Sequence, residues 1–268
     1  MVYPGMEKMT ININKNKNIG RVLFIVEGLK TEFDIIHKIF TRVFDYKYEK
    51  FDRLGRYSKY NTKSNLNSSV FVINTENSSI KSVGDANHYL DKLYVTLIEK
   101  YRFPVNKSAI FYIFDRDVKS NQDAEFIADL LKRLTNSRAS NGFNMQGLLL
   151  LSYPSIESFV LSNFTKNCFD MEFELGKTLK RYLCINQISE HKIKESTLFL
   201  ATHEMLSALN KLGIHTYDID NFGETNLTIF NKQEEYYLIN QKYRLLSLVC
   251  MALIDLGIIE INDGYEIN

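Results

Sequence analysis

The chain has 268 residues, of which 45% are hydrophobic and 24% charged, and its 33 basic and 32 acidic side chains give a net charge of +1. This composition is ordinary for a folded protein with a real core and excludes a disordered chain. The longest apolar stretches fall far short of the roughly 20 residues that a membrane-spanning helix needs. The length allows one large domain, or a catalytic domain followed by a smaller helical one.

The N-terminus and the cysteines indicate a compartment. Residues 11–18 alternate Asn and Lys, without the apolar stretch of a signal peptide. Cys168, Cys184 and Cys250 are odd in number and widely spaced, with no CxxC pair. They are typical of buried or free thiols in a reducing compartment. We therefore expect a cytoplasmic protein with no membrane partner.

Apolar runs alternate with helical patterns through the first part of the chain. After a loose start over residues 1–19, a first strand is expected at about Gly20–Val26, and a helical pattern follows it from Asp34 to Val43. Three more strands are expected, and helices are expected between them. Those strands are Val70–Ile73, Ala109–Phe114 and Leu148–Leu151, and the helices run from a cap at Asp85 to about Tyr101 and from Phe126 to Leu134. This alternation predicts an α/β fold with a mainly parallel central sheet and helices on both faces.

From Ser155 onward the pattern becomes helical. The expected helices cover residues 155–164, 175–189, 194–212 and 225–256. The shift in composition near residue 165 predicts a catalytic α/β domain over residues 20–164 and a helical C-terminal region over residues 165–268. Whether that region is a separate domain or packs as one body with the sheet stays open.

Acidic residues follow two of the predicted strands. Glu27 comes directly after the first strand, and Asp115 and Asp117 follow Phe114. An open α/β sheet keeps its ligand site at the carboxyl ends of its strands. Clustered carboxylates repel one another unless they are protonated or bridged by a cation, and Mg²⁺ or Mn²⁺ suits such oxygen ligands. The spacing therefore predicts a hard-metal site at this edge.

Other charged residues stand near these acids in the sequence. Glu157 opens the helix after Leu148–Leu151, where it can serve the helix dipole or the metal equally well. Glu32 can hold a metal-bound water or cap the first helix, and Lys30 can reach a phosphate. Arg116 and Lys119 flank the acid pair and can offset phosphate charge. For Glu32, Lys30, Arg116 and Lys119, an ordinary exposed charge is at least as good an explanation.

A basic and aromatic stretch lies between residues 42 and 63. Seven basic residues, with Arg53, Arg56 and Lys59 among them, are interleaved with the aromatic residues Tyr46, Tyr48, Phe51, Tyr57 and Tyr60. Bases with aromatics suit phosphate neutralisation and base stacking. A solvated connector whose tyrosines fold onto the core is an equal alternative.

Other enzyme classes find little support. The segment Gly28-Leu29-Lys30-Thr31 lacks the first glycine of a phosphate-binding loop. The five histidines show no HxxxH or HExxH spacing, and no GxSxG elbow surrounds Ser152. An aromatic and aliphatic stripe from Tyr236 to Val249 is typical of a core or a dimer seam.

The run from Val22 to Glu32, with Phe114-Asp115-Arg116-Asp117, resembles the Toprim family of topoisomerases, primases and small nucleases. The resemblance covers residues 20–164. It implies that Glu27 is a catalytic acid or base and that Asp115 and Asp117 bind Mg²⁺. The Glu-Gly-x-Lys-Thr-Glu form and Pro154 to Glu157 are most similar to stand-alone bacterial Toprim proteins of the RloB, OLD and PARIS types. By that analogy Glu32 and Glu157 complete the metal site, while Lys119 and Ser120 stand where many members carry another acid, which leaves one or two metals open.

The predicted function is therefore a Mg²⁺-dependent nuclease acting on DNA or RNA, as the toxic effector of an anti-phage defence system. The catalytic residues would be Glu27 and Lys30, and Glu27, Asp115, Asp117, Glu157 and Glu32 would hold the metal. The polynucleotide would contact Arg53, Arg56, Lys59, Arg116 and Lys119. The alternative is a partner-gated effector docked on another protein such as an ATPase, with a homodimer as a further candidate assembly.

Overall fold

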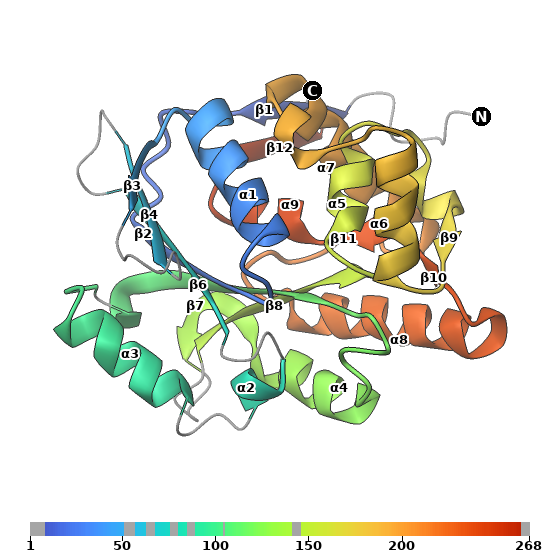
Figure 1. The fold of residues 1–268 in the computed structure, drawn as a ribbon, viewed down its shortest axis with the longest axis horizontal. Coiled ribbons are helices and arrows are strands. Elements are labelled where there is room, and N and C mark those ends of the chain that lie inside the picture. The colour runs from blue at the N-terminus through green and yellow to red at the C-terminus, as the bar shows by residue number, and fades with distance from the viewer. Residues whose placement is uncertain are drawn as a thin grey trace, which may run out of the picture.

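The computed structural model describes residues 9–50, 57–62, 68–75, 80–84, 89–103, 105–140 and 146–263. A twisted sheet runs through the middle of the molecule, and helices cover both of its faces (Figure 1). The strand order of this sheet is β11-β8-β6-β2-β5-β4-β3, with β7 paired to β8.

Four parallel strands form the centre of the sheet, and all four were predicted from their apolar runs. They are β5 (Ser69–Asn74), β2 (Arg21–Val26), β6 (Ser108–Asp115) and β8 (Gln146–Tyr153). Strand β2 pairs in parallel with β5 and β6, and β6 pairs in parallel with β8. Strands covered on both faces need apolar side chains in both directions, which explains their continuous runs. Their carboxyl ends therefore share one edge of the sheet.

The outer strands are antiparallel, so the sheet is mixed. On one side lie β4 (Tyr57–Asn61) and β3 (Lys47–Lys50), and on the other β7 (Thr135–Ser140) and β11 (Leu246–Ser247) flank β8. The expectation of an α/β fold with a largely parallel sheet is confirmed at this level.

Helices lie on both faces of the sheet (Figure 1). On one face lie α1 (Thr31–Lys38), α5 (Glu157–Ser162), α6 (Gly176–Ile185), α7 (Glu195–Lys211) and α9 (Val249–Asp255). On the other lie α2 (Lys81–Gly84), α3 (Tyr89–Glu99), α4 (Ala124–Arg133) and α8 (Gly223–Asn240). A π-helical turn η1 (Ile39–Val43) continues α1, and short 3₁₀ turns lie at η3 (Val105–Lys107), η4 (Cys168–Asp170) and η5 (Glu190–Lys192).

The C-terminal region packs against the same core as the sheet. One helix was expected over residues 225–256, but α8 ends at Asn240, where Gln241 takes a left-handed conformation with φ of 54°. The chain then forms β10 (Tyr243–Arg244), which pairs with β9 (Glu172–Phe173), before β11 joins β8 and α9 follows. The single-helix prediction was therefore wrong, because apolar periodicity does not reveal two-residue strands.

A loose start was expected over residues 1–19, but the described part of this segment contains a strand. Residues 9–13 form β1 (Met9–Ile13), which pairs antiparallel with β12 (Ile259–Asp263). The predicted cap at Asp85 lies outside the described residues.

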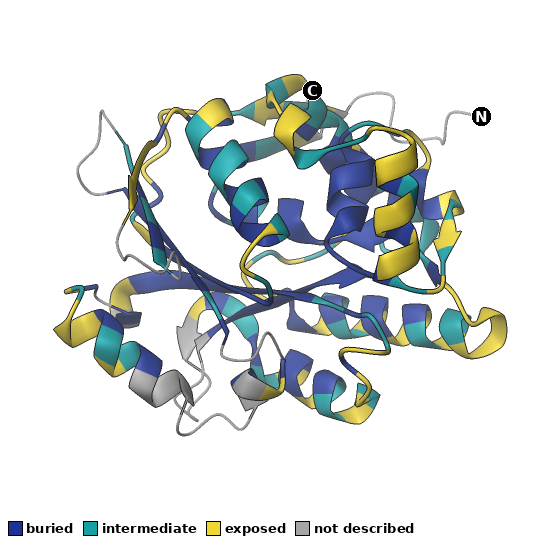
Figure 2. Cartoon of the chain, viewed as in Figure 1, coloured by how far each residue is buried: buried dark blue, intermediate teal, exposed yellow. Residues whose placement is uncertain are grey.

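Burial is concentrated in the central sheet and in α5 and α9 (Figure 2). All three cysteines are free thiols, with Cys168 and Cys250 buried and Cys184 exposed. Among the described helices, none combines the length and the apolar character needed to cross a membrane.

Arg116 ties α8 to the end of β6. Its side chain is 2% exposed, and its Nε and Nη2 donate to Glu234 Oε1 and Oε2 at 2.8 and 2.6 Å. Its Nη1 donates to Asn121 O at 2.7 Å, and the rings of Phe230 and Tyr243 lie 5.6 and 5.7 Å from the guanidinium carbon. A bidentate buried pair of this kind fixes position more than it adds net stability.

Removing one partner of this pair should be costly, because it leaves the other charge buried alone. We expect Arg116→Ala to lower the free energy of unfolding by about 3–5 kcal/mol, measured by urea denaturation. The matched control is Lys15→Ala, whose pair with Glu195 is exposed on both sides, and it should cost under about 1 kcal/mol. An Arg116→Ala variant as stable as the control would contradict the conclusion that the Arg116–Glu234 pair anchors α8 to β6.

Candidate metal centre at the carboxyl ends of the strands

Glu27 directly follows β2, and its side chain reaches the end of the neighbouring strand β6. Its backbone N–H continues the ladder to Ile113 O at 3.2 Å. Its Oε2 accepts from the backbone N–H of Asp115 at 2.9 Å and from Asn121 Nδ2 at 3.3 Å. The carboxylate is thus fixed beside the next acid by the sheet itself.

Asp115 is the last residue of β6 and connects to the segment after β8. Its Oδ1 accepts from the backbone N–H of Ile156 at 2.7 Å, directly before α5. Glu157 opens α5, where its Oε2 accepts from Ser155 Oγ at 2.8 Å and its Oε1 lies 3.7 Å from Lys180 Nζ. The ends of β2 and β6 and the segment that follows β8 therefore meet at one place.

Glu32 folds back over the turn that follows Glu27. Its Oε1 accepts from the backbone N–H of Gly28 at 3.0 Å. A Cβ at position 28 would lie 2.7 Å from Glu32 Oε2, closer than real Cβ contacts come. The close approach of this carboxylate, and not a left-handed backbone, therefore explains the glycine.

Asp117 differs from the other acids in how its oxygens are used. Its Oδ1 accepts from the backbone N–H of Lys119 at 2.9 Å, and its Oδ2 from the N–H of Gly176 at 2.8 Å. Gly176 is the first residue of α6, so Asp117 holds the start of that helix. Its charge still raises the pKa of Glu27, which places it near the site.

Burial and mutual repulsion disfavour the charged forms of these carboxyls. Burial, with smaller contributions from the Glu32 and Asp117 charges, raises the pKa of Glu27 to about 7. The pKa of Asp115 is raised well above its usual value, first by burial and then by the charges of Glu27, Glu32 and Glu157. Burial also raises the pKa of Glu32. Glu27, Glu32, Asp115, Asp117 and Glu157 therefore form one electrostatic cluster.

The donor set fits a hard divalent cation. Glu27 Oε1 and Asp115 Oδ2 accept no hydrogen bond from the described residues. Asn121 is 2% exposed, and its Oδ1 is buried without a partner in the described structure. Open carboxylate and amide oxygens are the ligands that Mg²⁺ and Mn²⁺ take.

The basic residues expected at the site differ in their exposure and in their partners. Lys30 and Lys119 are exposed beside Glu27 and Asp117 along the chain. Arg116 is buried in its pair with Glu234, which gives it a structural role in place of the expected phosphate contact. Lys59 lies on β4, 3.7 Å from Glu49 and over the ring of Phe71. Arg53 and Arg56 lie outside the described residues.

The tyrosines of the basic stretch mostly pack inward. Tyr46 and Tyr60 are buried against Phe40, and Tyr57 packs on Tyr101. Tyr48 is exposed by 39%. For the buried rings the core alternative therefore explains the pattern, and base stacking does not.

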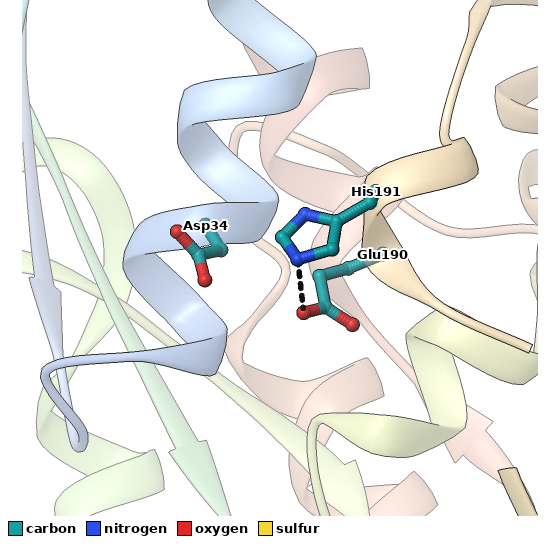
Figure 3. A group of neighbouring side chains, drawn as sticks. All are labelled: Asp34, Glu190 and His191. Carbon is teal, nitrogen blue, oxygen red and sulfur yellow. Dashed lines mark ion pairs between the residues drawn. The ribbon is translucent and has the colours of Figure 1, made fainter. Parts of the chain in front are cut away.

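A second group of metal-capable side chains lies between α1 and η5. Asp34, Glu190 and His191 each offer a ligand atom, and these atoms all lie within 4.8 Å of one another. Figure 3 shows the His191 ring beside the carboxylates of Asp34 and Glu190. The His191 Nε2 lies 3.7 Å from Glu190 Oε1. Within the described residues this trio is the group found at that spacing, and the strand-end acids do not form such a group.

Sequence reasoning missed several residues of both groups. Asn121 stands four residues after Asp117 in a polar loop, and Lys180 lies on a helix with no motif around it. The trio joins residues more than 150 positions apart. No local spacing signals any of these contacts.

The chain matches no family model, no curated protein and no solved structure. Its likeness to Toprim proteins rests on the motifs alone and stays a prediction.

The raised pKa of Glu27 makes stability depend on pH. The folded state keeps this proton up to about pH 7, whereas the unfolded chain loses it near 4.5. The stabilisation is complete below pH 4.5 and is lost as the pH rises through 7. In EDTA we therefore expect Glu27→Gln to match the wild type at pH 5 and to exceed it at pH 8 by on the order of 2–3 kcal/mol.

Urea denaturation at the two pH values measures this difference. Glu125→Gln, on the exposed face of α4, is the matched control and should leave the pH profile unchanged. A Glu27→Gln profile parallel to that of the wild type would show that Glu27 titrates normally.

Proposed function

We propose that the protein is a Mg²⁺- or Mn²⁺-dependent nuclease that cleaves phosphodiester bonds at the carboxyl edge of its sheet. One observation carries the proposal: Glu27 and Asp115 leave neighbouring parallel strands, and the backbone N–H of Asp115 donates to Glu27 at 2.9 Å. The buried Asn121 Oδ1 lies on a side chain that donates to the same carboxylate.

Each acid has a distinct task in this proposal. Glu27, with a pKa near 7, can exchange a proton at neutral pH and serves as the general acid or base. Asp115, with Glu32 and Glu157, would hold the cation. A bound cation would supply charge stabilisation to the phosphate and orient it. Asp117 fixes the start of α6 beside the site.

The rim of the site is where a phosphate would approach. Lys30 is exposed and has no partner among the described side chains, so its ammonium is free to bind a phosphate oxygen. Lys180 is 68% exposed and already lies near Glu157. Mobile cations at the edge of an acidic site offset repulsion between the carboxylates and the substrate.

The motif resemblance supports a nuclease over other phosphate chemistry. The Glu-Gly turn directly follows β2, and the Asp-Arg-Asp segment begins at Asp115, the last residue of β6. The resemblance of these two motifs to those of Toprim nucleases supports the proposal. An effector role in anti-phage defence, in the cytoplasm, belongs to the same proposal. The substrate is a polynucleotide, either DNA or RNA.

A second candidate is a partner-gated effector, docked on a protein such as an ATPase or on a second copy of the chain. Leu238 and Ile239 at the end of α8 are exposed by 74% and 82%, and adjacent aliphatic side chains of this kind favour a docking surface. Tyr237, part of the stripe expected at such an interface, instead stacks on Tyr243 at 4.6 Å within the fold.

A cleavage panel tests the nuclease. The purified protein is incubated with linear and supercoiled DNA, total RNA and tRNA, in Mg²⁺, Mn²⁺ or EDTA. We expect metal-dependent cutting, with Glu27→Gln and Asp115→Asn reduced at least about 100-fold, because each removes a group that acts on the reacting phosphate.

The controls separate chemistry from folding. Glu125→Gln should cut like the wild type, and circular dichroism should show all variants folded. Wild-type activity in Glu27→Gln would overturn its assigned role. Absence of cutting in a folded protein that binds Mn²⁺ would favour the partner-gated candidate.

A further inference from the structure

A concave region lies at the opposite end of the sheet from the acids. It is a cavity of about 670 Å³ where β2 and β6 begin and α9 ends. Gly20 and Arg21 line it from the start of β2, and Lys107 and Ser108 from the start of β6. A six-residue strand separates Arg21 from Glu27, which corresponds to roughly 20 Å. The cavity is therefore distinct from the candidate metal centre.

The charge around this cavity is strongly one-sided. Lys17, Arg21 and Lys107 line it with exposed side chains, and the described structure gives none of these three side chains a hydrogen bond or ion pair. The fourth cation, Arg138, is already paired with Asp255 at 3.0 Å. Three positive charges therefore remain without a counter-charge.

Asp255 cannot balance those cations. Its side chain is 4% exposed, and besides the pair with Arg138 its Oδ2 accepts from Ser137 Oγ at 2.6 Å. Lys17 lies across the turn after α9, because a Cβ at Gly257 would come within 3.2 Å of its Nζ. Like charges gathered around one cavity repel one another, and a bound anion removes that cost.

We propose that this cavity binds a small phosphorylated ligand of nucleotide size. Its volume falls in the range of small-molecule sites. Arg and Lys side chains bind phosphate oxygens, Arg through two parallel N–H groups. Three free cations match the charge of a diphosphate or triphosphate, and Ile19, Ala109 and Leu256 give the cavity an apolar wall for an uncharged part of the ligand.

A polynucleotide fits this cavity less well. Contacts to a long phosphate backbone need cations spread along a track. Here the cations gather around one hollow between two strand starts and the turn after α9. The site stands independently of the nuclease proposal, since none of its residues belongs to the acid cluster.

Isothermal titration calorimetry with ATP, ADP, AMP, pyrophosphate and adenosine tests the proposal. EDTA is present throughout, so that no metal carries phosphate to the acids. We expect ADP and ATP to bind, and adenosine to bind at least about 10-fold more weakly than ADP. Arg21→Ala/Lys107→Ala should lower the affinity for ADP at least about 10-fold.

Lys132→Ala/Lys232→Ala is the matched control, because it removes two exposed charges outside the cavity. It should keep wild-type affinity, and circular dichroism should show both double variants folded. Lys107→Glu alone gives a second reading if the Arg21 change disturbs β2. Failure of every phosphorylated probe to bind would overturn the proposal. Equal losses in the two double variants would also overturn it, as would a single-stranded oligonucleotide that binds the cavity more tightly than ADP.

Discussion

The candidate metal centre depends on one constraint: the fold holds several carboxyl groups close together in a buried position. Parallel strands bring their carboxyl ends to one edge, and Glu27 and Asp115 follow two such neighbours. Burial and mutual repulsion raise the pKa values of both groups. Backbone amides of Asp115 and Ile156 hold them in place. A divalent cation is the simplest way to satisfy this arrangement at neutral pH.

The same strand end also anchors the opposite face of the molecule. Asp115 faces the acid cluster, and the next residue, Arg116, pairs with Glu234 of α8 across the sheet. Successive side chains of a strand point to opposite faces, so one short segment carries both an acid of the candidate site and the anchor of α8. Asn121 links the two, because its amide donates to Glu27 while its carbonyl accepts from Arg116. A change at Arg116 therefore reaches the site through the loop that carries Asn121.

Much of the sheet could be predicted from the sequence, because strands buried on both faces leave continuous apolar runs. The strands around Val22–Val26, Val70–Ile73, Ala109–Phe114 and Leu148–Leu151 follow this rule. The pairing of β1 with β12 joins the two ends of the described chain, and such non-local contacts leave no local pattern. The turn at Gln241 lies in the short polar triplet Asn240-Gln241-Lys242, and apolar residues on both sides of it fit the period of a single helix.

The candidate site was predictable only as far as its acids. Glu27, Asp115 and Glu157 follow strands, and the rule about carboxyl ends brings them together. No sequence pattern indicates that both carboxylate oxygens of Asp117 accept hydrogen bonds from backbone amides, or that Arg116 is buried. Partners on distant helices decide both outcomes: the backbone N–H of Gly176 in α6 for Asp117, and the side chain of Glu234 in α8 for Arg116. The trio of Asp34, Glu190 and His191 depends in the same way on the packing of η5 against α1.

The central claim is that the strand-end acids bind a divalent cation. Anomalous scattering from a crystal soaked in Mn²⁺ tests it most directly, because the peak locates the ion without reference to activity. The account predicts a peak between Glu27 and Asp115 that Asp115→Asn abolishes. A peak found at Asp34, Glu190 and His191 alone, or no peak at the strand ends at saturating Mn²⁺, would contradict it.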